Sequence, residues 1–286
     1  MSEVGSEPVV PGRGPVDGVV LDLDGVVHRG EQSIEGATSA IAWLRSRDVR
    51  ILFMTNHASR TATQIIDRLA CFGVRAEPDD VVTSSAVTAG VLTERGYRGK
   101  RAIVIGGEGI REALAQTGIA LEDDPGRDDA DVVVVAWDDK FTYADLRRAS
   151  RAVRAGAALF ATNDDPSFPQ ADGLCPGAGA ILAAVETAAG RRAEVVGKPH
   201  RPMMDTAARR LSDRQHVAII GDNPSTDLAG GARLGWTTIL VLSGVTTSPQ
   251  ADAVHPRPDL VIDSLAALIG DERFGSTAVG VGTSGS

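Results

Sequence analysis

Cysteine and aromatic residues are scarce in this sequence. Cys71 and Cys175 are the only cysteines, and Phe, Trp and Tyr together make up 4% of the 286 residues. Two distant thiols cannot form a four-ligand zinc site, and so few cysteines are typical of proteins from reducing compartments. We therefore expect two free thiols and a cytoplasmic protein.

Long apolar runs and an excess of basic residues are also missing. No stretch reaches the roughly 18 consecutive apolar residues of a transmembrane helix, and the N-terminal MSEVGSEPVVPGRGP lacks the basic and apolar regions of a signal peptide. The formal net charge is −9, whereas binding to a nucleic-acid backbone needs a basic surface. We expect neither a membrane nor a nucleic acid as a partner.

Short runs of β-branched residues alternate with helical patterns along the chain, which predicts βαβ units and a mainly parallel sheet. The first expected strand, residues 19–23, is apolar except at Asp22, as a strand buried on both faces requires. Further strands are expected at 50–54, 81–82, 216–220, 237–241 and 260–262, with helices at 36–47, 61–72, 202–211 and 226–234 and another that follows the strand at 81–82 and runs through Leu92.

The pattern restarts near Gly99. A strand is expected in KRAIVIGG, with further strands at 131–136 and 157–161 and helices at 109–116, 143–155 and 177–189. The sequence therefore predicts an α/β protein whose parallel-sheet core is interrupted by a second α/β domain. We expect a core of residues 17–83 and 193–270, an insertion of residues 84–192, and flexible tails at 1–16 and at the Gly/Ser-rich 271–286.

Two carboxylates, Asp22 and Asp24, leave the first expected strand directly ahead of Gly25, in the segment VVLDLDGVV. They would repel each other unless a cation or a proton lies between them, and Gly25 allows the chain to turn sharply. A surface turn would also place acidic residues there. Taken alone, the segment is consistent with a turn or with a catalytic pair.

Two further polar clusters favour phosphate. Thr55 and Asn56 end the second strand ahead of a helix that begins with hydroxyl residues, where phosphate oxygens bind well, although Ser59 or Thr61 at that position is also a typical helix N-cap. Lys198 follows a glycine and precedes a proline in VVGKPHRPMM. It is placed either to bind a phosphate group or simply to be solvated.

A last acidic cluster follows the apolar strand in VAIIGDNPSTDLAGG, where Asp222 and Asp227 are separated by one helical turn. Carboxylates at strand ends are typical Mg²⁺ ligands, although an Asx-turn that begins the next helix would look similar. Ligands of open parallel sheets bind at the carboxyl ends of the strands. We therefore expect these clusters to meet at one edge of the sheet.

The order strand-D-x-D-G, strand-T-N, loop-G-K-P and strand-G-D-(x)₄-D resembles the four motifs of the haloacid dehalogenase (HAD) superfamily. The insertion between the second motif and the lysine motif is similar to that of the type-IIA branch, which has p-nitrophenylphosphatase-like and NagD-like members. The segment ATNDDPSFPQADGLCPGAGA resembles the cap segment of that branch. The resemblance implies a Rossmann-like core with an inserted α/β cap domain, and a phosphoric monoester hydrolase.

The resemblance also implies a role for each motif residue. Asp22 would be the nucleophile that forms an aspartyl-phosphate, and Asp24 the general acid and then the general base. Mg²⁺ would be held by Asp22, the backbone carbonyl of Asp24, and Asp222. Asp227 would support the water ligands of the metal.

The residues expected to bind the substrate are Thr55, Asn56 and Lys198 on the transferring phosphoryl group, His57 beside them, and Asn163 and Gly177 in the cap. Many relatives carry Asn where this chain has His57, so we expect altered contacts with the leaving group. The substrate is expected to be a small phosphorylated metabolite, and the resemblance allows a homodimer through the cap.

Three alternatives are open at this stage. The same motifs serve phosphotransferases and mutases, and a catalytically silent module could keep the fold to bind a phosphorylated ligand. The segment IVIGGEGIREAL also places Gly106, Gly107 and Gly109 after a strand, as in nicotinamide-binding proteins. Its spacing departs from G-x-G-x-x-G, which makes this last alternative weak.

Overall fold

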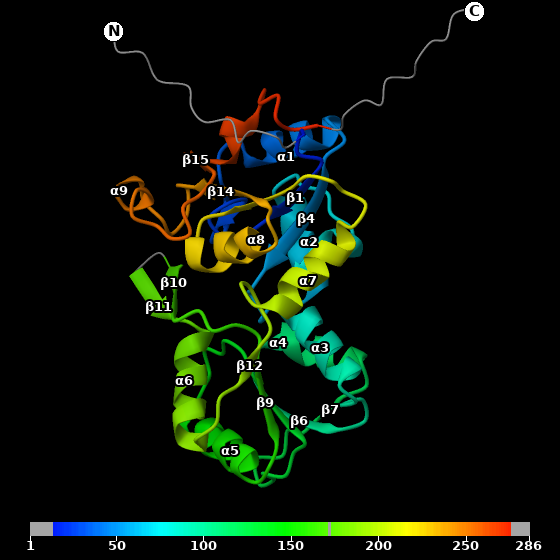
Figure 1. Cartoon of the computed structure of the whole chain (residues 1–286). Coiled ribbons are helices and arrows are strands. Elements are labelled where there is room, and N and C mark those ends of the chain that lie inside the picture. The colour runs from blue at the N-terminus through cyan, green and yellow to red at the C-terminus, as the bar shows by residue number, and fades with distance from the viewer. Residues whose placement is uncertain (1–13, 171–172, 276–286) are drawn as a thin grey trace, which may run out of the picture.

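The computed structural model describes residues 14–170 and 173–275. Its largest sheet has the strand order β15-β14-β13-β1-β4-β5, and all neighbouring strands are parallel. The strands are β1 (Gly18–Leu21), β4 (Arg50–Thr55), β5 (Val81–Thr83), β13 (Val217–Gly221), β14 (Thr237–Val241) and β15 (Leu260–Ile262). We call this sheet and its helices the core (Figure 1).

Strand β1 is buried on both faces of the core sheet. Val19 and Leu21 pack into one apolar cluster with α1 (Ala37–Ser46) and α2 (Ala62–Cys71). Val20 packs into the cluster on the opposite face, with α7 (Arg201–Arg210). This alternation explains why nearly every residue of the strand is apolar. Shorter core elements are β2 (His28–Arg29), β3 (Gln32–Ser33), η1 (Pro78–Asp80), η2 (Pro224–Leu228), α8 (Ala229–Arg233), α9 (Ser248–Ala251) and η3 (Leu265–Leu268).

A second parallel sheet, with the order β12-β9-β8-β6-β7, lies at the other end of the molecule (Figure 1). One of its faces is covered by α5 and α6 and the other by α4. Its elements are α3 (Ser84–Glu94), β6 (Arg101–Ile105), α4 (Glu108–Gln116), β7 (Ala120–Leu121), β8 (Val132–Val135), α5 (Tyr143–Arg154), β9 (Ala158–Ala161), α6 (Ala178–Ala189) and β12 (Glu194–Val195).

Helices α3 and α4 lie between the two sheets (Figure 1). Leu92, Ile110 and Leu114 of these helices are fully buried, in one cluster with Leu52 of the core sheet and Val132 of the second sheet. A continuous apolar cluster thus joins the two halves of the chain. Burial of this kind contributes about 1.5–3 kcal/mol for each large apolar side chain, so the two sheets are firmly packed together.

The structure confirms the α/β class and corrects several element bounds. Strand β1 ends at Leu21, so Asp22 lies just beyond the strand. The helix expected at 226–234 begins at Pro224 as the π-helical turn η2 and continues as α8. It begins there because Asn223 caps its first turn by accepting from the Ser225 N–H. A hairpin of β10 (Ser167–Gln170) and β11 (Gly173–Pro176) has no counterpart in the expected elements.

Packed structure extends beyond the expected bounds of the core at both ends. The Val16 N–H donates to the Arg273 carbonyl oxygen, and the Phe274 ring is 1% exposed and packs edge-on against Trp43. The parts expected to be tails therefore include the buried residues Val16, Phe274 and Gly275, while 1–13 and 276–286 lie outside the described residues. Within the described ranges, no helix is long and apolar enough to span a membrane.

Candidate active site

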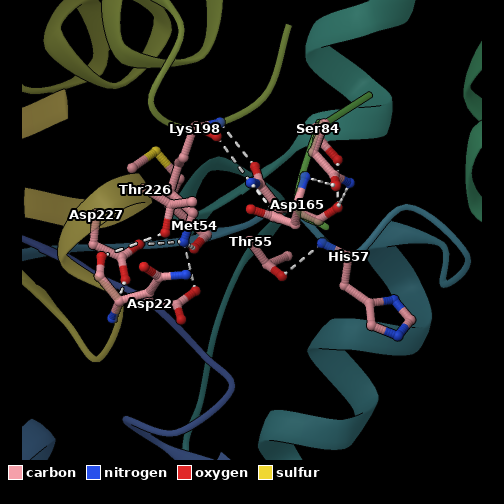
Figure 2. A network of polar contacts seen from close by, with 12 residues as sticks. Asp22, Met54, Thr55, His57, Ser84, Asp165, Lys198, Thr226 and Asp227 are labelled. Atoms are coloured by element: carbon pink, nitrogen blue, oxygen red, sulfur yellow. Dashed lines mark hydrogen bonds and ion pairs between the residues drawn. The ribbon is translucent and has the colours of Figure 1, made fainter. Parts of the chain in front are cut away.

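The motif residues meet at the carboxyl edge of the core sheet (Figure 2). Asp22 follows β1, Thr55 ends β4, and Asp222 follows β13. Lys198 lies in the loop between β12 and α7, and Asp227 lies in η2. The expected convergence of the clusters is therefore present, because parallel strands bring their carboxyl ends to one edge.

Lys198 is at the centre of this group. Its Nζ donates to Asp22 Oδ1 and Asp227 Oδ1, both at 2.7 Å, and to the Met54 carbonyl oxygen at 3.2 Å. The residue is 3% exposed. Burial alone would lower the pKa of Lys198, but the charges of Asp22 and Asp227 outweigh it and raise that pKa above its usual value. The side chain is therefore a fixed positive charge.

Three carboxylates, those of Asp22, Asp222 and Asp227, each offer an oxygen within 4.8 Å of the others. Burial raises the pKa of Asp22 well above its usual range, against the opposing charge of Lys198. Burial and the Asp227 charge raise the pKa of Asp222 to about 7. With all three carboxylates ionised and a single ammonium group among them, the cluster would carry an excess of negative charge that a divalent cation would neutralise.

The two acidic residues of the fourth motif are held differently. The two oxygens of Asp227 accept from Lys198 Nζ and, at 3.2 Å, from the Asn223 N–H. Asp222 Oδ2 accepts from the Val245 N–H at 2.7 Å, and Gly244 lies so close that a Cβ there would overlap this carboxyl group. The loop after β14, which the sequence motifs did not indicate, thus belongs to the site.

Gly25 shapes the turn after Asp24. Its φ of 80° lies in the left-handed region, and a Cβ at this position would overlap Asp222. Both facts require glycine here. The turn expected from D-x-D-G is therefore present, and it brings the first and fourth motifs into contact.

Asp24 lies outside the group of three carboxylates, and its side chain is 55% exposed. It lies beside His28, whose Nδ1 is 3.4 Å from Asp24 Oδ1. Sequence reasoning missed His28. The one available signal was its position four residues after Asp24 in the same turn, where the backbone pairs Asp24 with His28.

Thr55 and Asn56 join the second motif to the lysine loop. Thr55 Oγ1 accepts from the His57 N–H at 3.0 Å. Asn56 Oδ1 accepts from the Lys198 N–H at 2.8 Å, and Asn56 Nδ2 donates to the Lys198 carbonyl oxygen and to Asp165 Oδ2, both at 3.0 Å. The side chain of Asn56 therefore fixes the position of Lys198, while the His57 ring points away from Lys198 (Figure 2).

The expected cap residues have structural contacts. Asn163 is 5% exposed, and its Nδ2 donates to the Asn56 carbonyl oxygen at 3.0 Å. Gly177 precedes α6, and a Cβ there would overlap the Asp165 carbonyl oxygen. Contact of Asn163 or Gly177 with a substrate stays a prediction.

The glycine-rich segment after β6 docks on the loop of the second motif. Helix α4 has no side-chain N-cap. Instead, the Gly109 N–H donates to the Ser59 carbonyl oxygen at 3.0 Å and the Ile110 N–H to that of Ala58 at 2.9 Å. A Cβ on Gly109 would overlap the Arg60 carbonyl group. The weak nicotinamide alternative is therefore wrong, because the helix N-terminus that would bind a pyrophosphate is occupied by the protein itself.

Comparison with known proteins agrees with this site. A family model described as haloacid dehalogenase-like hydrolase matches residues 19–120, and a second, HAD-hydrolase-like, matches residues 195–268. The chain is 33% identical over 255 residues to an acid sugar phosphatase from Staphylococcus haemolyticus, which is 89% of this chain and 95% of that protein.

Solved structures show the same similarity. A p-nitrophenyl phosphatase from Archaeoglobus fulgidus matches with a TM-score of 0.80 and 30% identity, over 90% of this chain and 99% of that one. A glycerol phosphate phosphatase from Mycobacterium tuberculosis in complex with calcium matches with a TM-score of 0.79 and 35% identity, over 88% of this chain and 74% of that one. A magnesium complex of the same protein is also similar.

The chain belongs to the haloacid dehalogenase superfamily. Within it, the p-nitrophenylphosphatase-like relatives place the chain in the type-IIA branch, and it is a phosphoric monoester hydrolase. The acidic cluster of Asp22, Asp222 and Asp227 is of the kind that holds a divalent metal ion in this superfamily.

Proposed function

We propose that this chain is a Mg²⁺-dependent phosphatase that hydrolyses a small phosphorylated metabolite through an aspartyl-phosphate on Asp22. The observation that carries the proposal is the meeting of Asp22, Asp222 and Asp227, with Lys198 Nζ bonded to Asp22 and Asp227. An anionic nucleophile that approaches an anionic ester must be offset by positive charge, which Lys198 and a divalent cation held by these carboxylates would supply.

In the first step, a carboxylate oxygen of Asp22 attacks phosphorus and the bond between phosphorus and the ester oxygen breaks. Asp24 gives its proton to the leaving oxygen. Lys198 binds the phosphoryl oxygens, together with Thr55 and the backbone at Asn56. A Mg²⁺ ion held by Asp22, Asp222 and the backbone carbonyl of Asp24 would add positive charge at the same oxygens.

In the second step, water attacks the phosphorus of the aspartyl-phosphate. Asp24, now a carboxylate, takes a proton from this water as the bond between phosphorus and Asp22 breaks. Inorganic phosphate is released and Asp24 is protonated again. Both steps use the same residues, so no further acid or base is required.

We also propose that residues 84–192 form a cap domain that covers this edge of the core sheet and excludes water during transfer. Direct bonds from this part of the chain to the second motif, such as that from Asn163 to Asn56, support the arrangement. Pairing of two copies through the cap stays a prediction, which light scattering of the purified protein would test.

A panel of phosphorylated compounds, assayed for phosphate release with and without Mg²⁺, tests the proposed function. Sugar phosphates, glycerol phosphate, nucleoside monophosphates and p-nitrophenyl phosphate belong on the panel, because the relatives differ in the substrates that they are named for. We expect Mg²⁺-dependent release from at least one of them. Transfer to an added alcohol without net release would favour a phosphotransferase, and binding without either reaction would favour a silent phosphate-binding module.

A further inference from the structure

A buried histidine in the turn after the first motif has no role in the steps above. His28 is 5% exposed, yet its Nδ1 is a buried polar atom without a hydrogen-bond partner among the described residues. Buried polar atoms are nearly always paired, so an unpaired one needs an explanation. The nearest acidic group is the carboxyl group of Asp24, whose Oδ1 lies 3.4 Å away.

The surroundings of His28 fix both its backbone and its ring. The Gly25 N–H donates to the His28 carbonyl oxygen at 2.7 Å, which closes the turn that carries Asp24. The His28 ring packs against the Phe72 ring, with centroids 5.4 Å apart. The guanidinium group of Arg68 lies over the Phe72 ring, 5.5 Å from its centroid. The imidazole is therefore held on one side of Asp24, while the Asp24 carboxyl group itself is half exposed.

We propose that His28 is a positioning residue for Asp24, which it holds through Oδ1 so that the other carboxyl oxygen faces the leaving group. The inference rests on the proposed function, in which Asp24 is the acid and then the base. An imidazole nitrogen suits both states, because it accepts a hydrogen bond from the carboxylic acid and, in its other tautomer, donates one to the carboxylate. The two atoms are 3.4 Å apart, and we expect this distance to shorten when Asp24 engages the leaving group.

The leaving group provides a readout that a purely structural role would not move. An alkyl phosphate expels a strongly basic alkoxide, which must be protonated by Asp24 as it departs. p-Nitrophenolate is a stable anion and leaves with little need for an acid. The value of kcat/KM covers only the steps up to the aspartyl-phosphate, so the comparison of the two substrates isolates the protonation step.

The test uses the variants His28→Phe and His28→Asn. Phenylalanine keeps the ring against Phe72 and removes Nδ1, whereas asparagine places an amide nitrogen near the position of Nδ1. We expect His28→Phe to lower kcat/KM for an alkyl phosphate by about tenfold or more and that for p-nitrophenyl phosphate by no more than about threefold. We expect His28→Asn to recover most of the loss with the alkyl phosphate.

The matched control is His216→Phe, because His216 lies just before β13, at the opposite edge of the core sheet from the site. We expect this variant to leave kcat/KM unchanged for both the alkyl phosphate and p-nitrophenyl phosphate. Two outcomes would overturn the inference, provided that both variants melt as the parent does. One is an equal loss of kcat/KM for both substrates in His28→Phe, and the other is no recovery in His28→Asn. If His28→Phe does not fold, His28→Leu, which also removes Nδ1, takes its place in the same comparison with the same two outcomes. A parent protein that releases phosphate from no ester refutes the proposed function instead, so the two failures are distinguishable.

Discussion

Lys198 Nζ lies 2.7 Å from Asp22 Oδ1, although 176 residues separate the two in the sequence. The contact exists because β1 occupies the centre of the core sheet and the chain returns to the same edge after completing the second sheet. The side chains of Lys198 and Asp22 are 3% and 12% exposed. Because they are paired at this distance and largely shielded from water, the site is preorganised. Such preorganisation is the main source of catalysis in phosphoryl transfer.

Asp22→Asn should abolish turnover and leave the fold intact. Asparagine has nearly the same shape and can still accept a hydrogen bond from Lys198, but it cannot attack phosphorus as a carboxylate does. Loss of a nucleophile lowers kcat by roughly 10³-fold or more. Steady-state kinetics and circular dichroism check the prediction together. Activity above a tenth of that of the parent would show that Asp22 is not the nucleophile.

Removal of the metal should abolish activity and destabilise the protein. Asp222 and Asp227 are buried, and the Asp22 side chain is 12% exposed. A divalent cation would stabilise the ionised forms of these carboxyl groups, so Mg²⁺ should raise the melting temperature, with a gain of about 2.7 kcal/mol at a hundredfold excess over Kd. Titration calorimetry of Asp222→Asn should show affinity for Mg²⁺ weaker by about tenfold or more. Asp205→Asn is the control, because Asp205 lies on α7 outside the cluster. Unchanged affinity in Asp222→Asn would refute the assigned metal site.

The stability of the metal-free protein should fall as the pH rises. The pKa of Asp222 is about 7 in the folded state, against 3.8 ordinarily, because of burial and the Asp227 charge. Between these values the folded protein holds a proton that the unfolded chain has lost, so the free energy of unfolding decreases with increasing pH.

Thermal melts in a chelator should therefore give a higher melting temperature at about pH 5.5 than at about pH 7.5. Asp222→Asn removes the titrating group, and we expect a smaller difference between the two pH values in that variant. An equally large difference in the variant and the parent would contradict the assignment to Asp222.

Gly109→Ala should impair the site from a distance. The added methyl group would overlap the Arg60 carbonyl group and push α4 away from the loop that carries Asn56. Overpacking of this kind costs about 1–3 kcal/mol of stability, and we expect kcat/KM to fall by about tenfold because small displacements of a positioned group are costly. Gly90→Ala in α3 is the matched control, since nothing lies near its Cβ position. Equal activity of the two variants would show that this docking contact has no influence on the site.

Much of this architecture could be predicted because it depends on local sequence. The apolar residues of β1 and β13 lead directly into Asp22 and Asp222, and each of these strands is recognisable from a few neighbouring residues. Their convergence then follows from the parallel order of the strands. Lys198 was identifiable from its motif, although its burial and its pairing with Asp227 were not.

The features that could not be predicted depend on contacts between distant segments. Asn56 bonds to Lys198 and Asp165, and α4 takes its N-terminal cap from Ala58 and Ser59; neither interaction leaves a mark in local sequence. The β10–β11 hairpin contains Pro169 and Gly173, which are uncommon in strands. His28 was missed because a single histidine in a turn carries no periodic signal.

The most direct test of the account is to trap the phosphorylated residue. The enzyme would be quenched in acid during turnover of p-nitrophenyl phosphate with Mg²⁺, treated with borohydride, and digested for peptide mass spectrometry. Reduction of an aspartyl-phosphate yields homoserine, and we predict homoserine at position 22 in the peptide that contains VVLDLDGVV. Homoserine at another aspartate, or none at all in an enzyme that accumulates its phosphorylated form, would contradict the central claim.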